Sequence, residues 1–189
     1  AELLTLAENI TRGNYEAGVV SAKDAAMELL DDLERVDSGY QPLVESGFRE
    51  LDRTLGGGFI REGLYILAAR PGCGKTTLAT AIAERMLEQG RRVLFVSLEM
   101  SRKQLTARRV AADVGAVTAF QVLRGALTDE QRNAVTESLV KLSKRPLAFN
   151  RKGSLDVGEI QFLAKQNRSD MVVIDYLGLM RHKDGKSLY

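Results

Sequence analysis

The chain contains very little of several residue types, and each shortage excludes a class of protein. Its 189 residues include one cysteine, one histidine, three prolines and no tryptophan. A single cysteine excludes an intrachain disulfide and fits a reducing cytoplasm, which is where we expect the protein to act. His182 has no partner histidine or cysteine for a metal, which argues against a zinc-type site.

Signals for membranes and secretion are also missing from the sequence. No apolar run approaches the length of a membrane-spanning helix, and no signal-peptide pattern appears at the N-terminus, so we expect no membrane partner. The net charge of +2 is too small to indicate nucleic-acid binding from composition. With 44% hydrophobic and 28% charged residues, the composition is that of one globular domain with an appendage.

The most informative segment runs from Ala69 to Thr77 and reads Ala-Arg-Pro-Gly-Cys-Gly-Lys-Thr-Thr. It lies between an apolar strand pattern and a helix pattern, which is the context of a phosphate-binding loop. The free N–H groups of a helix N-terminus suit phosphate oxygens, and Gly72 and Gly74 let the backbone curve closely around them. We expect Lys75 to reach the β- and γ-phosphates and the Thr76 hydroxyl to hold Mg²⁺.

Two acidic residues follow apolar runs and are candidates for the same site. Met171–Asp175 is typical of a buried parallel strand that delivers a carboxylate to its C-terminal edge, where Asp175 would support Mg²⁺ through its water shell. Glu99 follows the apolar run Val93–Ser97 and would lie near the same edge. A carboxylate there can orient the water that attacks a γ-phosphate, although its position equally allows a solvated loop residue.

Strand patterns alternate with helix patterns along most of the chain, which predicts a mostly parallel α/β sheet. Capping boxes at Ser101/Gln104 and Thr128/Gln131 mark two helix starts. The predicted strands are Leu64–Ala68, Val93–Ser97, Leu147–Phe149 and the run ending at Asp175; the predicted helices cover residues 48–55, 76–89, 101–114, 128–144 and 155–166.

Residues 1–40 differ from this pattern and form a separate helical segment, which leaves 41–189 as the main domain. Ser21 is placed to cap a helix over residues 22–36, and an apolar stripe at helical spacing runs along it. Such a helix must pack on something. It can cover its own domain or dock on a neighbouring subunit, and amphipathicity does not decide between them.

Four segments of residues 22–189 resemble the replicative hexameric DNA helicases of the DnaB type, whose motor is a RecA-like ATPase domain. The loop at 68–77 has the family's form, including alanine at position 69, where the general motif has glycine. Ser97-Leu98-Glu99-Met100-Ser101 is the most discriminating segment. Gly178 departs from the glutamine that the family usually has. The segments are 46–58, 68–77, 97–105 and 174–180.

The resemblance implies a truncated RecA-like P-loop NTPase core that binds ATP and Mg²⁺. It implies that Lys75 and Glu99 are catalytic, with Glu99 as base or water-orienting residue, and that Thr76 and Asp175 serve the metal. The helix at residues 22–36 resembles the linker helix that docks on the adjacent subunit. The nucleotide-binding residues it implies are Arg70, Pro71, Gly72, Cys73, Gly74, Lys75, Thr76 and Thr77.

The same resemblance implies binding partners and a low rate of ATP hydrolysis by this chain. The expected partners are single-stranded DNA, the other subunits of a homo-oligomeric hexameric ring, a primase and a helicase loader. Arg181, Lys183 and Lys186 form a basic segment that is a candidate for DNA contact, with a merely solvated loop as the alternative. The family's motor continues past its acidic strand to an arginine finger, so we expect this chain to bind ATP but hydrolyse it weakly.

Two other functions remain open. The chain could belong to a RecA-like ATPase that remodels DNA or drives recombination without unwinding, or it could be a nucleotide-binding interaction module. Ser97-Leu98-Glu99-Met100 favours the helicase over the first, and the presence of Glu99 argues against the second. Cys73 has no necessary role, because a phosphate loop works through backbone N–H groups. For Arg108 and Arg109 an ion pair is the expected role.

Overall fold

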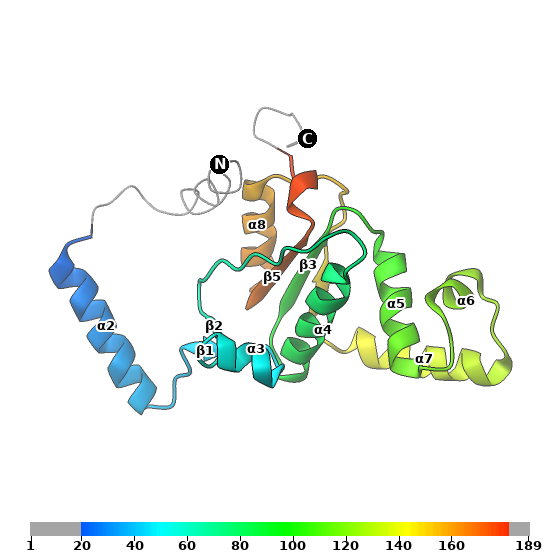
Figure 1. Cartoon of the computed structure of the whole chain (residues 1–189), viewed down its shortest axis with the longest axis horizontal. Coiled ribbons are helices and arrows are strands. Elements are labelled where there is room, and N and C mark those ends of the chain that lie inside the picture. Colours follow the sequence, from blue (N-terminus) through cyan, green and yellow to red (C-terminus); the bar gives the residue numbers. More distant parts are fainter. Residues whose placement is uncertain (1–19, 182–189) are drawn as a thin grey trace. The chain divides into compact units, whose positions relative to one another are not determined.

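The structure is a computed structural model that describes residues 20–181 (Figure 1). These residues divide into two compact units, with the boundary between Pro71 and Gly72. Within residues 20–181 no helix combines the length and apolar character needed to cross a membrane. Secondary structure in the second unit alternates between helices and strands, as the sequence pattern predicts.

Within residues 20–71, the first unit contains two helices and a short antiparallel ladder. Helix α2 (Ala22–Asp37) is followed by β1 (Leu43–Val44), α3 (Arg49–Thr54) and β2 (Phe59–Ile60). Strand β1 pairs with β2 in the register Leu43↔Ile60 and Val44↔Phe59. Gly58 makes this approach possible: its φ is +141°, and a Cβ there would lie 2.6 Å from the Val44 carbonyl oxygen. The sequence patterns do not predict this ladder.

Helix α2 matches the predicted helix closely. The Ser21 hydroxyl accepts a hydrogen bond from the Asp24 N–H at 3.1 Å, as expected of an N-cap. None of the helix residues is buried, and its apolar stripe remains open to solvent. The exposed apolar side chains of α2 are Met27, Leu29, Leu30, Leu33 and Val36.

The second unit is built on a three-stranded parallel sheet in the order β4-β3-β5. Strand β3 (Val93–Ser97) is central, and all its residues are buried. It pairs with β4 (Leu147–Phe149) on one side and with β5 (Met171–Asp175) on the other. The other elements of this unit are α4 (Lys75–Glu88), α5 (Arg102–Val114), α6 (Ala119–Arg124), α7 (Asp129–Ser143), α8 (Val157–Asn167) and η1 (Leu177–Leu179).

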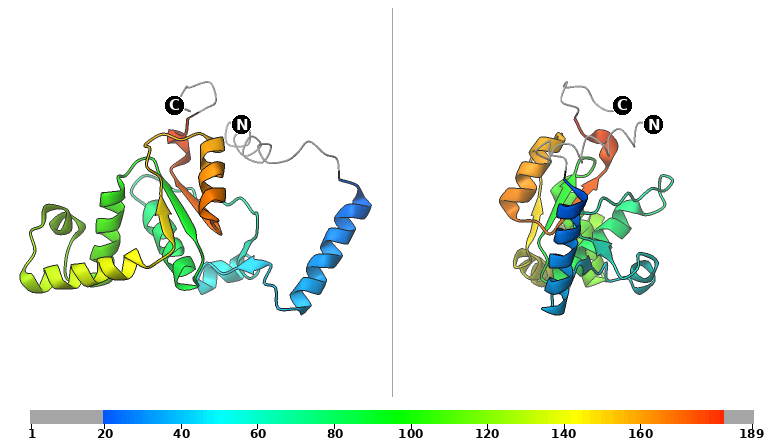
Figure 2. Two further views of the ribbon diagram at one scale, coloured as in Figure 1. Left: turned by 180° about the vertical axis from the view of Figure 1, so that it is seen from behind. Right: turned by 90° about the vertical axis from the view of Figure 1, so that its left-hand side faces the viewer.

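Helices α4 and α8 cover opposite faces of this sheet. Because side chains alternate along a strand, Leu94 and Val96 of β3 point to one face, where they cluster with Ile160 of α8. Phe95 points to the other face, beside Ala83 of α4. The two opposite views agree with this placement (Figures 1 and 2). The buried sheet therefore has the two-sided apolar environment that parallel strands need.

Helices α5, α6 and α7 form a smaller cluster of their own around Val110, Val117 and Val135. The predicted capping boxes at Ser101/Gln104 and Thr128/Gln131 are both present. Polar contacts connect this cluster to α4, and another connects α5 to α7. Glu84 of α4 forms ion pairs with Arg109 and Arg145, which agrees with the ion pair expected for Arg109. Ser138 of α7 donates to Asp113 of α5 at 2.6 Å.

The predicted strand at Leu64–Ala68 is wrong, because the segment has no strand hydrogen bonding in this structure. Its apolar side chains are exposed rather than buried. Apolar periodicity gives a segment the tendency to form a strand, but a strand exists only beside a neighbour that takes up its backbone groups. Tyr65 instead accepts a hydrogen bond from the Ile60 N–H at 2.7 Å and packs its ring against Phe59.

The Ser138–Asp113 bond supports a pH-dependent stability prediction. The Ser138 hydroxyl lowers the pKa of Asp113 below its ordinary value of 3.8, with help from nearby Arg109 and two further cations. A lowered folded-state pKa adds stability at higher pH that is lost as pH falls through that pKa. We expect Ser138→Ala to reduce the free energy of unfolding by about 0.5–1 kcal/mol at pH 7, the low end because Asp113 is exposed.

The measurement is urea unfolding of wild type and Ser138→Ala between pH 7 and pH 2. The difference between the two proteins should shrink as pH falls below about 4, since the carboxylate is then protonated in both states. Ser143→Ala is the matched control, because Ser143 lies on the same helix and bonds only a backbone carbonyl. A difference that stays constant down to pH 2 would show that the Asp113 charge is not involved.

Candidate nucleotide-binding site

The site is built around the N-terminus of α4. Gly74 caps the helix in the left-handed conformation with φ +87°, and Gly72 has φ +79°. A Cβ would find open space at Gly72 and only ordinary contact at Gly74, so glycine is needed for the backbone turn rather than for room. Lys75 and Thr76 then open the helix, whose first turn contains no acid. This leaves a positive helix end, which suits an anion.

The structure brings two of the predicted residues into direct contact. The Thr76 hydroxyl donates to the Asp175 carboxylate at 2.8 Å, although the two residues are 99 positions apart. Asp175 is the last residue of β5 and is 7% exposed. The strand therefore delivers a largely buried carboxylate to the start of α4, as the sequence pattern predicts.

Glu99 lies in the turn that follows β3, at the same edge of the sheet. The parallel register aligns Ser97 with Asp175, and the Leu98 N–H donates to the Asp175 carbonyl oxygen at 2.8 Å. Glu99 therefore directly follows Leu98, whose N–H is bonded to the last residue of β5. Its side chain is exposed. A carboxylate at this position is accessible to a water molecule or a ligand.

The oxygen atoms gathered here fit Mg²⁺ better than they fit a softer metal. Mg²⁺ takes hydroxyl, carboxylate, water and phosphate oxygens, and it is usually held by few protein ligands. In residues 20–181 no three side chains of histidine, cysteine, aspartate or glutamate form a metal-binding cluster. Thr76 and Asp175 could therefore hold the metal only together with water and the oxygens of a bound phosphate.

The structure also gives the place in the fold of several other predicted site residues. Cys73 and Thr77 belong to the second unit with Lys75, whereas Arg70 and Pro71 end the first unit. The Cys73 thiol is exposed. Arg181 donates to Glu159 at 2.8 Å and lies 3.8 Å from Asp156.

The ion pairs of Arg181 bear on the candidate DNA-contacting segment. The pKa of Glu159 is lowered, chiefly by a hydrogen bond from Lys152 and then by the Asp156 N–H, with nearby Arg181 contributing. Part of the Arg181 charge is therefore balanced by α8. Lys183 and Lys186 lie outside the described residues, as does His182. Contact with DNA at this segment stays a prediction.

Sequence reasoning missed one residue at this edge of the sheet, Asn150. It follows β4 directly and is 6% exposed. Its side chain accepts from the Ser97 N–H at 2.9 Å and donates to the Ser97 carbonyl oxygen at 3.0 Å. A polar residue immediately after a short apolar strand was the available signal, because such positions face the carboxyl edge of a parallel sheet.

A parallel sheet whose carboxyl edge meets a glycine-bounded helix start, with a hydroxyl and a carboxylate paired there, is the arrangement of the P-loop ATPases. Comparison with known proteins narrows this class. The DnaB-like helicase C terminal domain matches residues 44–188, and the chain belongs to that family.

Curated relatives agree with this assignment. The chain is 31% identical over 179 residues to the replicative DNA helicase DnaB of Geobacillus stearothermophilus, covering 91% of this chain and 39% of that protein. It is 31% identical over 193 residues to the replicative DNA helicase DnaC of Bacillus subtilis, covering 96% and 42%. The chain thus spans about two fifths of the length of these relatives.

Solved structures give the same result and confirm the RecA-like fold class. A solved ATPase domain superposes with a TM-score of 0.72 at 27% identity, covering 90% of this chain and 62% of that one. A DnaB-like replicative helicase, solved in a study of its interactions with primase, superposes with a TM-score of 0.68 at 26% identity. That match covers 99% of this chain and 46% of the other.

The exposed thiol of Cys73 allows nucleotide binding to be tested without introducing a cysteine by mutation. A bound nucleotide on the loop should shield the thiol from a maleimide reagent. At a Mg-ATP concentration about ten times the dissociation constant, we expect labelling to slow about tenfold. The measurement is the labelling rate by mass spectrometry, and because Cys73 is the only cysteine the signal comes from one site.

Lys75→Ala is the control for this experiment, because it keeps the thiol but removes the cation expected to contact the phosphates. Its labelling rate should depend much less on Mg-ATP. Equal protection of both proteins would mean that the nucleotide binds elsewhere, and no protection of wild type would remove the loop from the site.

Proposed function

We propose that this chain is the ATP-binding motor region of a replicative DNA helicase. In the complete protein it would couple ATP hydrolysis to translocation on single-stranded DNA and to duplex unwinding, within a hexameric ring. The observation that carries this proposal is the contact of Thr76 with Asp175 at the start of α4, beside the turn that bears Glu99. The family membership and the names of the curated relatives support the same function.

Each site residue has a role that its chemistry supports. Lys75, in the first turn of α4, would contact the β- and γ-phosphates together with backbone N–H groups of that turn. Thr76 and Asp175 would hold Mg²⁺, Asp175 through water, and the metal would supply electrostatic stabilisation of the phosphate charge. Glu99 would orient the attacking water and take its proton.

The remaining loop residues contribute mainly through their backbone. Gly72 and Gly74 have the positive φ values that turn N–H groups toward an anion. We propose the whole set from 70 to 77 as the nucleotide-binding loop, and residues 1–40 and 41–189 as the linker segment and the motor domain. The family match, which begins at residue 44, supports that boundary.

We further propose that α2 docks on a neighbouring copy of this chain. Its apolar stripe is exposed, and an apolar stripe along a helix normally packs against another surface. A primase is a proposed partner because the similar DnaB-like helicase was solved in a study of its interactions with primase. The helicase loader, and the DNA contacts of Arg181, Lys183 and Lys186, rest on the resemblance alone.

Glu99→Gln in the complete protein tests the catalytic assignment. Because glutamine cannot accept the proton, we expect kcat for ATP hydrolysis to fall about 10²–10⁴-fold. The dissociation constant for ATP should stay nearly unchanged, since Glu99 would not bind the nucleotide. The measurements are steady-state ATPase rates and equilibrium binding of a fluorescent ATP analogue.

Glu137→Gln is the matched control, because Glu137 is an exposed glutamate on α7. It should leave both quantities unchanged. A wild-type rate for Glu99→Gln would sink the assignment of Glu99. DNA-stimulated hydrolysis by wild type without unwinding of a forked duplex would favour a remodelling or recombination ATPase instead.

The docking of α2 can be tested by changing its apolar stripe. Leu30→Ser with Leu33→Ser should lower the solution mass measured by light scattering, because it removes apolar area that would be buried against the neighbour. Glu28→Gln with Asp31→Asn is the control, since both residues lie on the polar side of α2. A monomeric wild type in Mg-ATP, or an unchanged mass for the leucine variant, would contradict docking in trans.

A further inference from the structure

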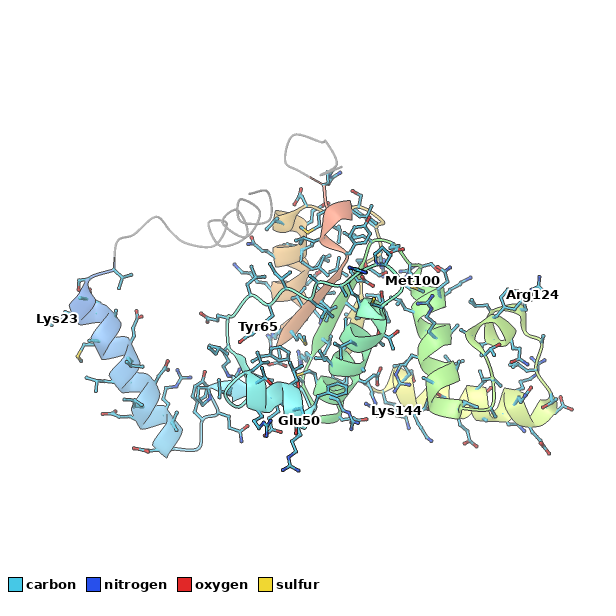
Figure 3. The ribbon with its side chains drawn as sticks, in the orientation of Figure 1. Lys23, Glu50, Tyr65, Met100, Arg124 and Lys144 are labelled. Atoms are coloured by element: carbon cyan, nitrogen blue, oxygen red, sulfur yellow. The ribbon has the colours of Figure 1, made fainter. Side chains whose placement is uncertain are left out.

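The turn that carries Glu99 is closed by a single side chain. The Ser97 hydroxyl donates to the Met100 carbonyl oxygen at 2.7 Å and accepts from the Met100 N–H at 3.2 Å. Both backbone groups of Met100, labelled in Figure 3, are thus tied to the last residue of β3. Leu98 and Glu99 form the tip of the turn between these ends. Since Ser97 is 6% exposed, little water competes for the hydroxyl.

Ser97 is itself held from the β4 side by Asn150. The backbone pairing of β3 with β4 ends at Phe95↔Phe149. Beyond that point the Asn150 amide takes over, accepting from the Ser97 N–H and donating to the Ser97 carbonyl oxygen. The same amide nitrogen also donates to the Lys152 carbonyl oxygen. One side chain therefore satisfies both backbone groups of Ser97 and fixes its own loop.

On the β5 side the turn is held by the backbone. The Leu98 N–H donates to the carbonyl oxygen of Asp175, whose carboxylate accepts from Thr76. The residues on both sides of Glu99 are therefore connected to the strands of the sheet. These bonds fix the distance from the Glu99 backbone to Asp175. The rotation of the Glu99 side chain is then the main motion left in the turn.

We propose that Ser97 and Asn150 are positioning residues for the ATPase reaction, acting through Glu99. The proposal rests on the function proposed above, in which Glu99 orients the attacking water. A displacement of about 1 Å at such a group costs about 100-fold in rate. Holding the turn at Ser97 therefore affects the chemical step and leaves nucleotide binding, which takes place at the start of α4, unaffected.

Ser97→Ala is the direct test, because it removes the link to Met100 and keeps the backbone bonds to Asn150. In the complete protein we expect kcat for ATP hydrolysis to fall about 10–100-fold. The dissociation constant for ATP and the thermal unfolding midpoint should change little. Ser97→Thr keeps the hydroxyl and should restore most of the rate, which a loss of packing alone would not allow.

Asn150→Asp is the second test, because it preserves shape and the acceptor for the Ser97 N–H but loses both N–H donors. We expect a fall in kcat of similar size with unchanged ATP affinity. Asn133→Asp is the matched control. Asn133 is an exposed asparagine on α7, and its substitution makes the same change in charge. It should hydrolyse ATP at the wild-type rate.

A double-mutant cycle with Glu99→Gln separates positioning from a general structural effect. If Ser97 acts through Glu99, Ser97→Ala should have almost no further effect on the single-turnover rate of Glu99→Gln. Multiplied losses would overturn the proposal, as would a wild-type kcat for Ser97→Ala. A wild-type rate for Glu99→Gln itself would instead contradict the proposed function, so the two failures can be told apart.

Discussion

The parallel pairing of β3 with β5 is the constraint on which the candidate site depends. Its register places Ser97 opposite Asp175 and lets the Leu98 N–H bond the Asp175 carbonyl. Through this pairing an acid at the end of one strand and a turn at the end of its neighbour meet at one edge. The Thr76–Asp175 hydrogen bond then joins that edge to the start of α4. A shift of one residue along the ladder would turn Asp175 to the other face of the sheet.

Polar side chains continue the sheet where its backbone pairing ends. The Asn150 side chain provides for Ser97 the hydrogen bonding that a neighbouring strand would otherwise give, and the Ser97 hydroxyl closes the turn with Met100. Buried groups of this kind must be satisfied, so they specify one backbone path at the edge of the sheet that carries the candidate site. Further along α4, Glu84 joins Arg109 and Arg145 and connects the phosphate-loop helix to α5 and the end of α7.

Much of the fold follows from local pattern, and each failure has its own cause. The helices at α2, α4, α5, α7 and α8 and the strands β3, β4 and β5 agree with the predicted elements to within a few residues. The strand predicted at Leu64–Ala68 is absent because strand formation needs a neighbour, which periodicity does not reveal. Helix α6 was missed because it is short, although Thr118 and Gln121 form a capping box that was readable in the sequence.

Local sequence patterns specify the chemical groups available to the protein. Two glycines before Lys75 and Thr76 allow a tight turn into a helix, and acids that follow apolar strands supply carboxylates. Both patterns extend over only a few residues, so both can be recognised in the sequence. Which of these groups come into contact depends on the packing of the whole domain. The contact of Thr76 with Asp175 and the hold of Asn150 on Ser97 join residues 99 and 53 positions apart. Such pairs depend on strand order and register, which arise from packing the whole sheet.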